Sequence, residues 1–254
     1  MKTMKKIPFI LSCILLVTVL ISSCKKDDTT TPTPTPTPSP SNPIPSIPSN
    51  VAGVLVAIQT QTKPPIVIPG MPIQMINVGL AVAMFPSSTS GVNYNAGNIS
   101  VNTFPLTKDT SNMYMYQPGA ANPLGLEFTS PPSWTVSGSA NVPAFNATAN
   151  SFPTDVNVTS SATFSIASSY TLTCDLVTGA DSLIFSVYGP KAFVTKSKAG
   201  NSTSHTFTAA ELATVGSGFG YIQVTAYKLK PVVNSNKTYW LINENVATIG
   251  ATLQ

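Results

Sequence analysis

Few side chains in this sequence can carry covalent or acid–base chemistry. There are three cysteines and one histidine, and arginine is absent. Cys174 shares an alternating apolar row with Leu172 and Leu176, so we expect a buried structural thiol; a nucleophilic thiol would need a base and partial exposure. We expect His205 to be a solvated strand residue, because one histidine makes no zinc site without further ligands. The sequence therefore predicts no catalytic residue, no metal site and no cofactor.

The acidic residues offer one alternative. Asp175 and Asp181 flank a turn that contains Gly179, and side by side they could bind calcium or act as a general acid and base. The loop lacks the dense Asp/Asn/Gly series of calcium loops, and turn chemistry explains both residues. A hydrolase that uses Asp155, Asp175 or Glu127 stays open as an alternative, although no spacing among the few acids suggests a pair.

The charge pattern excludes one class of partner. The formal net charge is +4, but Lys2, Lys5 and Lys6 lie in the first six residues, and the remaining lysines nearly balance the nine acids. Without arginine, the chain also lacks the usual bidentate clamp for phosphates and guanine edges. We therefore expect no nucleic-acid partner.

The N-terminus has the pattern of an export signal. A basic segment, Met1 to Lys6, precedes an apolar run, Ile7 to Ile21, that is shorter than the roughly 20 residues needed to span a bilayer. Ile21-Ser22-Ser23-Cys24 resembles the lipobox of bacterial lipoproteins. The resemblance implies that residues 1–23 are a signal peptide and that Cys24 becomes a lipid anchor in the membrane. An ordinary secretory signal with a chance cysteine is the alternative.

Charge and proline dominate the residues that follow. Lys25-Lys26-Asp27-Asp28 is similar to the charged tags of lipoproteins of the Bacteroidota, which implies an outer-membrane location, on the cell surface or the periplasmic face. A solvated charge run beside a membrane is the alternative. Residues 24–49 form the anchor and a linker. Its repeated Thr-Pro pairs predict a polyproline-II stalk with a reach of about 60 Å at most.

From residue 50 the pattern predicts an all-β fold: two antiparallel β-sandwich-like domains, residues 50–150 and 151–254, behind the signal and stalk. A polar stretch, Ala144 to Pro153, places the boundary near Asn150. The expected strands of the first domain are Val54 to Ile58, Ile76 to Met84, Ile99 to Val101, Met113 to Tyr116, Leu124 to Phe128 and Trp134 to Ser137. Those of the second are Tyr170 to Leu176, Ser182 to Gly189, Ser204 to Phe207, Gly220 to Leu229, Lys237 to Ile242 and Val246 to Leu253, with a capped helical turn, Glu211 to Val215.

The second half also resembles fibronectin type III and immunoglobulin-like modules. Ser169 to Tyr188 is similar to their strand B, turn and strand C, and Leu212 to Tyr227 is similar to their E–F corner. The resemblance implies a β-sandwich with Tyr221 as the corner tyrosine. Cys174 departs from the pattern, because it stands near where such modules often carry tryptophan.

Aromatic residues are the expected ligand contacts: Trp134, Trp240, Tyr239, Tyr114 and Tyr116. Exposed rings suit stacking on sugars, whereas buried rings only pack a core, and both interpretations stay open. We expect a non-catalytic surface binding or adhesion module for a glycan or another envelope protein. The alternative is a structural subunit of an outer-membrane assembly, which would use an exposed sheet edge at Lys237 to Leu253.

Overall fold

The computed structural model describes residues 51–62, 76–87 and 92–254. The leader with Cys13, the lipobox cysteine Cys24, the charged tag and the stalk lie outside the described residues. All described residues belong to one compact unit of the chain. None of the helices within the described ranges has the length and hydropathy of a membrane span.

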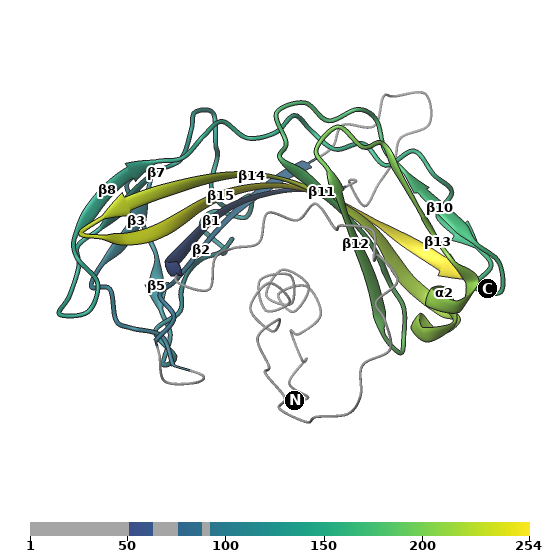
Figure 1. Ribbon diagram of the computed structural model, residues 1–254, viewed down its shortest axis with the longest axis horizontal. Helices are drawn as coiled ribbons and strands as arrows, with labels where there is room; N and C mark the ends of the chain where they lie inside the picture. The colour runs from purple at the N-terminus through teal and green to yellow at the C-terminus, as the bar shows by residue number, and fades with distance from the viewer. Residues whose placement is uncertain (1–50, 63–75, 88–91) are drawn as a thin grey trace, which may run out of the picture. The chain divides into compact units, whose positions relative to one another are not determined.

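Strands account for nearly all regular structure in the described ranges (Figure 1). The first half contains β1 (Val51–Thr62), β2 (Ile76–Met84), β3 (Ile99–Val101), β4 (Phe104–Pro105), β5 (Thr107–Lys108), β6 (Tyr114–Tyr116), β7 (Ser133–Val136) and β8 (Phe145–Thr148). The second half contains β9 (Thr163–Phe164), β10 (Tyr170–Thr173), β11 (Ser182–Tyr188), β12 (Phe193–Ala199), β13 (Ser204–Phe207), α2 (Ala209–Val215), β14 (Gly218–Asn234) and β15 (Lys237–Leu253).

One nine-stranded sheet, here called the main sheet, draws strands from both halves of the chain. Its order is β12-β11-β14-β15-β1-β2-β6-β5, and β9 pairs with β15. The all-β, sandwich-like expectation is confirmed. The main sheet is mixed instead of purely antiparallel, because β15 pairs in parallel with both β1 and β9.

Two 17-residue strands, β14 and β15, run through this sheet as a long hairpin (Figure 1). The turn between them contains Ser235 and Asn236, which have φ angles of 50° and 59°. Two consecutive residues with positive φ match the type I′ turn, whose twist suits a two-residue hairpin. The turn therefore fixes the register of all the pairs from Asn234↔Lys237 to Gly218↔Leu253.

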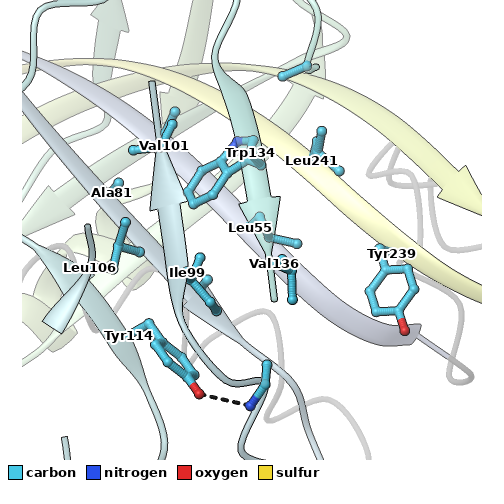
Figure 2. Close-up of a cluster of buried hydrophobic side chains, with 14 of the residues drawn as sticks. Leu55, Ala81, Ile99, Val101, Leu106, Tyr114, Trp134, Val136, Tyr239 and Leu241 are labelled. Carbon is cyan, nitrogen blue, oxygen red and sulfur yellow. Dashed lines mark hydrogen bonds between the residues drawn. The ribbon is translucent and has the colours of Figure 1, made fainter. Parts of the chain in front are cut away.

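One face of the main sheet, here called the packed face, carries two cores. Near β1 and β2, a four-stranded sheet of order β4-β3-β7-β8 covers it. Leu55 and Leu241 of the main sheet pack there against Ile99, Trp134 and Val136 of the covering sheet (Figure 2). These side chains alternate along each strand with residues of the opposite face, as expected for period-two strands.

The second core lies under β10, β13 and α2. Leu183, Phe185 and Val224 of the main sheet pack with Leu172 and Leu212 of the covering elements. The helix begins with a capping box: the Thr208 side chain accepts from the Glu211 backbone N–H, and the Glu211 carboxylate accepts from the Thr208 N–H. This confirms the capped helical turn that the sequence predicts.

Between the two cores the packed face is polar. Asn150 donates from Nδ2 to the Leu229 carbonyl over 3.1 Å, and Asn245 Nδ2 donates to Asp155 Oδ1 over 3.0 Å. Lys230 Nζ donates to the Thr148 carbonyl over 2.7 Å. Asn150 thus lies in the segment between β8 and β9, while the main sheet itself continues through both halves of the described chain.

Several predicted strands need correction. Leu124 to Phe128 is not a strand; Gly125 makes only an isolated bridge to Gly79. Phe193–Ala199 (β12) and Phe145–Thr148 (β8) are strands that the polar composition concealed. The two predicted strands in the last 18 residues are one, β15, because Asn243 and Asn245 lie on the polar middle of the packed face.

Candidate functional site

Three of the five predicted contact residues are core residues. Trp134, Tyr114 and Tyr239 are at most 1 % exposed and belong to the first core (Figure 2). Tyr114 Oη accepts a hydrogen bond from the Ala96 backbone N–H over 2.8 Å. The ring of Tyr239 packs against Phe145 with centroids 4.5 Å apart. A ring buried in this way offers no platform to a ligand, so core packing is the correct interpretation for these three.

The other two predicted residues are half-buried and lie apart. Tyr116 packs edge-on against Phe104, with centroids 5.7 Å apart, and its hydroxyl accepts from Asn122 Nδ2. Trp240 is on β15, on the face of the main sheet away from the two cores, here called the opposite face. The structure therefore does not bring the five predicted aromatics together into one site.

A different set of aromatic side chains does come together. Tyr188 is the register partner of Phe193 on one neighbouring strand and of Tyr221 on the other, so the three rings share the opposite face. Phe219 lies two residues before Tyr221 and packs edge-on against it, with centroids 5.1 Å apart. We call these four side chains the aromatic row. Phe219 is 66 % exposed and Tyr221 43 % exposed.

Hydrogen bonds hold the middle of the aromatic row in place. Tyr188 Oη donates to Gln223 Oε1 over 3.0 Å, and Gln223 Nε2 donates to Thr248 Oγ1 over 2.9 Å. The ring of Tyr188 also stacks on that of Phe193 with centroids 5.7 Å apart. Gly250, the register partner of Tyr221, has no side chain, and the Phe219 ring lies 3.4 Å from where its Cβ would stand. The row is therefore an ordered apolar surface beside hydroxyl and amide groups.

The sequence contained a signal for half of this row. Alternation in β14 places Ile222, Val224 and Ala226 on the packed face, so Phe219 and Tyr221 must face the other way. Their neighbours Tyr188 and Phe193 come from strands whose pairing with β14 cannot be read locally. Tyr221, expected at an E–F corner, lies inside the strand and is exposed.

Cys174 and His205 both lie at least half-buried against apolar neighbours. Cys174 is 5 % exposed and free, and burial followed by the charge of Asp175 raises the pKa of its thiol to about 11. His205 is half-buried instead of solvated, because it shares the face of Phe207 and packs edge-on against that ring at 4.7 Å. Burial, followed by Lys198, lowers the pKa of His205. Cys174 is thus the buried structural thiol that the sequence predicts.

The predicted carboxylates are each engaged separately. Asp181 Oδ1 lies 2.6 Å from Lys228 Nζ, and its Oδ2 accepts from the Leu229 N–H. Asp175 accepts from Asn157, and Asp155 accepts from Asn245. Within the described residues, no three His, Cys, Asp or Glu side chains are grouped as a metal site would require. Asp175 and Asp181 therefore each have their own partners, and these contacts do not support the alternative in which they act as a pair.

The predicted free edge at the C-terminus is not an edge. Lys237–Leu253 pairs with β14 along its whole length and with β1 over residues 238–247. β15 is consequently an interior strand of the main sheet over residues 238–247, and a partner strand cannot add there. The ends of the main sheet are β12 and β5.

The aromatic row on an all-β scaffold is the strongest candidate site of the described residues. A scan against protein-family models found no match to this chain, and a search of curated proteins found none either.

Proposed function

We propose that this chain is a non-catalytic, lipid-anchored protein of the bacterial cell envelope that binds a neutral glycan through the aromatic row. The observation that carries the proposal is the row itself: Phe219 and Tyr221 stand exposed on an ordered sheet, next to Tyr188 and Phe193. Exposed large aromatic side chains are costly in water, and a site that retains them next to each other is typical of a binding surface.

Glycan is the ligand class that this surface fits. The C–H faces of a pyranose ring pack on flat aromatic rings, and its hydroxyls need a few fixed polar groups beside them. Thr248 and Thr252 lie on the same face of β15, next to the row. The hydrogen bonds of Tyr188 and Gln223 hold the platform in place before binding, which reduces the entropy lost on association.

Charge supports a neutral ligand. The chain has no arginine, and the lysines that follow the leader nearly balance the acids. A phosphorylated or nucleic-acid ligand would call for clustered cations, and the four members of the row carry none.

Replacing both Phe219 and Tyr221 with alanine should weaken glycan binding at the row about a hundredfold. Each exposed ring lost from the centre of a binding surface should weaken binding about tenfold, which corresponds to ~1.4 kcal/mol. The measurement is a glycan array with the wild-type chain, followed by titration of the best glycan against each variant. Val233→Ser, at a 70 % exposed side chain near the far end of β14, is the matched control and should bind like wild type.

Two outcomes would contradict this. If the wild-type chain retains no glycan on the array, the ligand class is wrong. If the double variant binds the same glycan as tightly as Val233→Ser does, the row is not the site. A pull-down in which a protein partner is lost from the double variant alone would replace the glycan with a protein ligand.

The localisation has its own prediction. We propose that Cys24 carries the lipid and that the charged tag directs the protein to the outer membrane, with the head on the cell surface or the periplasmic face. Cys24→Ala should release the protein from membranes into the aqueous phase of a Triton X-114 partition, because only the acyl chains hold it there. A Cys13→Ala variant should partition like wild type, and retention of Cys24→Ala in the detergent phase would count against the anchor.

A further inference from the structure

The aromatic row runs across the strands of the main sheet and not along one of them. Phe193, Tyr188 and Tyr221 are register partners on β12, β11 and β14, and Gly250 of β15 continues the same line. Neighbouring strands lie ~4.8 Å apart, so the line from Phe193 to Gly250 measures about 14 Å. A pyranose is a six-membered ring, like the ring of phenylalanine, so one sugar covers only part of this line. The row therefore has room for at least two consecutive sugars.

The rings of the row do not lie in one plane. Tyr188 and Phe193 are inclined by 29° to each other, whereas Phe219 and Tyr221 meet edge-on at 79°. The face of a crystalline polysaccharide is flat, so it would need coplanar rings beneath it. A single dissolved glycan chain turns from one sugar to the next and can follow rings that are inclined to one another. The row thus fits a single glycan chain better than a solid surface.

Gly250 leaves a hollow beside the exposed end of the row. A Cβ atom placed there would meet only the Phe219 ring within 4 Å, at a distance of 3.4 Å, in the described part of the chain. Glycine weakens the interior of a strand, where it marks a bulge, a tight bend or the close approach of a ligand or of another backbone. The register of β14 with β15 is continuous on both sides of Gly250, its φ is not positive, and no described backbone atom of another strand lies within 4 Å. The close approach of a ligand is therefore the reason that remains for this glycine.

Two hydroxyl groups flank the hollow. Thr248 and Thr252 lie two residues before and two residues after Gly250, on the same face of β15, and Thr252 is exposed. Thr248 Oγ1 accepts from Gln223 Nε2 over 2.9 Å, which fixes its position and leaves its own hydrogen to donate. A sugar over Gly250 can therefore bind hydroxyls on two sides while its C–H face contacts the Phe219 ring.

We propose that the aromatic row binds consecutive sugars of one dissolved, neutral glycan chain that lies across β12, β11, β14 and β15. One sugar occupies the hollow over Gly250, between Thr248 and Thr252, and its neighbours along the glycan stack on the rings of the row. This inference rests on the proposed function, because it assigns the size and form of the glycan to the same site. The ligand is thus a soluble chain of several sugars, as opposed to a lone monosaccharide or a solid surface.

Glycan length is the first test, and it needs only the wild-type protein. Mono- to hexasaccharides from amylose, cellulose, mannan and xylan are titrated by isothermal calorimetry into the full chain, held in phosphatidylcholine nanodiscs. In a series that binds, affinity should rise about tenfold or more from the mono- to the trisaccharide, because each added sugar contacts further rings. Microcrystalline cellulose should not sediment the protein. Equal affinity for the mono- and the trisaccharide, or sedimentation with the solid alone, would overturn the proposal.

Filling the hollow is the second test. Gly250→Val should weaken binding of the trisaccharide about tenfold, because the added methyl groups take the space of the sugar beside Phe219. A β-branched residue suits a strand, and urea unfolding checks that the fold is kept. Gly119→Val makes the same change at an exposed glycine whose added Cβ has no described atom within 4 Å, and it should bind like wild type. Equal binding by the two glycine variants would show that no sugar occupies the hollow.

A further variant covers the case in which Gly250→Val does not fold. Thr252→Val removes one flanking hydroxyl at an exposed position and should weaken binding of the trisaccharide about threefold. Unchanged binding would remove the hollow from the site.

The results also separate this proposal from the proposed function. If no soluble sugar of any series binds, both are wrong. Binding can instead be lost in the variant that combines Phe219→Ala with Tyr221→Ala, yet be independent of sugar number and of Gly250→Val. That result would keep the row as a glycan site and overturn only the extended glycan chain.

Discussion

Replacing Trp134 with alanine should lower the free energy of unfolding by about 3–5 kcal/mol, the largest single-residue effect we expect. Trp134 is 0 % exposed and stands between Val101 and Val136 in the covering sheet, with Leu55 and Leu241 of the main sheet facing it (Figure 2). Alanine would remove most of the ring's contacts and leave a cavity that the surrounding strands cannot close, because their register pairs fix their spacing.

The same chemical change at an exposed site supplies the control. Phe219→Ala also truncates an aromatic ring, but at a side chain that is 66 % exposed, so it should change stability by about 0.5 kcal/mol or less. Urea unfolding followed by far-ultraviolet circular dichroism measures both variants without relying on tryptophan emission. A Trp134→Ala change of under 1 kcal/mol would show that this ring does not pack the first core.

Trp134 and Phe219 also show which property the sequence could predict and which it could not. Period-two alternation located β2, β3 and β13 to the residue, and it placed β1 correctly within larger bounds. Alternation reports which residues share a face, and it does not report which face is covered. Trp134 and Phe219 have similar local patterns, yet one is in a core and the other is exposed.

The pairing of strands that are distant in the sequence was the second property that the sequence pattern could not predict. β1 lies between β2 and β15, and the parallel register Val56↔Ile242 joins residues from opposite ends of the described chain. No local pattern encodes such a pairing, so the sequence suggested two separate sheets and an exposed last strand. The aromatic row was hidden for the same reason, because Tyr188 and Tyr221 meet only through the pairing of β11 with β14.

Glu244 is the residue whose position the sequence explained least, and its burial has a measurable consequence. It lies on the opposite face of β15, and its register partners are Tyr227 and Ile58, neither of which supplies a cation. Glu244 is 4 % exposed, and burial raises the pKa of its carboxyl to about 7. Asn243 and Asn245 on either side point to the packed face, so the three residues between the two predicted strands are part of one strand with a buried acid.

The stability of the protein should therefore decrease as pH rises from about 4.5 to 7. Below the unfolded-state pKa, the carboxyl is protonated in the folded and in the unfolded state, so its ionisation does not lower the free energy of unfolding. Between the two values the unfolded chain releases the proton while the folded chain keeps it, which favours unfolding by ~1.4 kcal/mol per pH unit. Above the folded-state pKa both states are ionised, and the loss, roughly 3 kcal/mol, is complete.

Glu244→Gln isolates this effect, because glutamine has nearly the same shape and does not ionise. Urea unfolding at pH 4.5, 5.5, 7 and 8.5 should give a wild-type stability that falls relative to the variant up to pH 7 and then runs parallel to it. Glu127→Gln, at an exposed acid, should follow wild type at every pH. Groups with lowered pKa values, such as Glu211 at about 2, cancel in the comparison because all three chains contain them. Parallel wild-type and Glu244→Gln curves across the whole range would mean that the folded protein holds this carboxyl ionised, with a cationic or hydrogen-bonding partner supplied from outside the described residues.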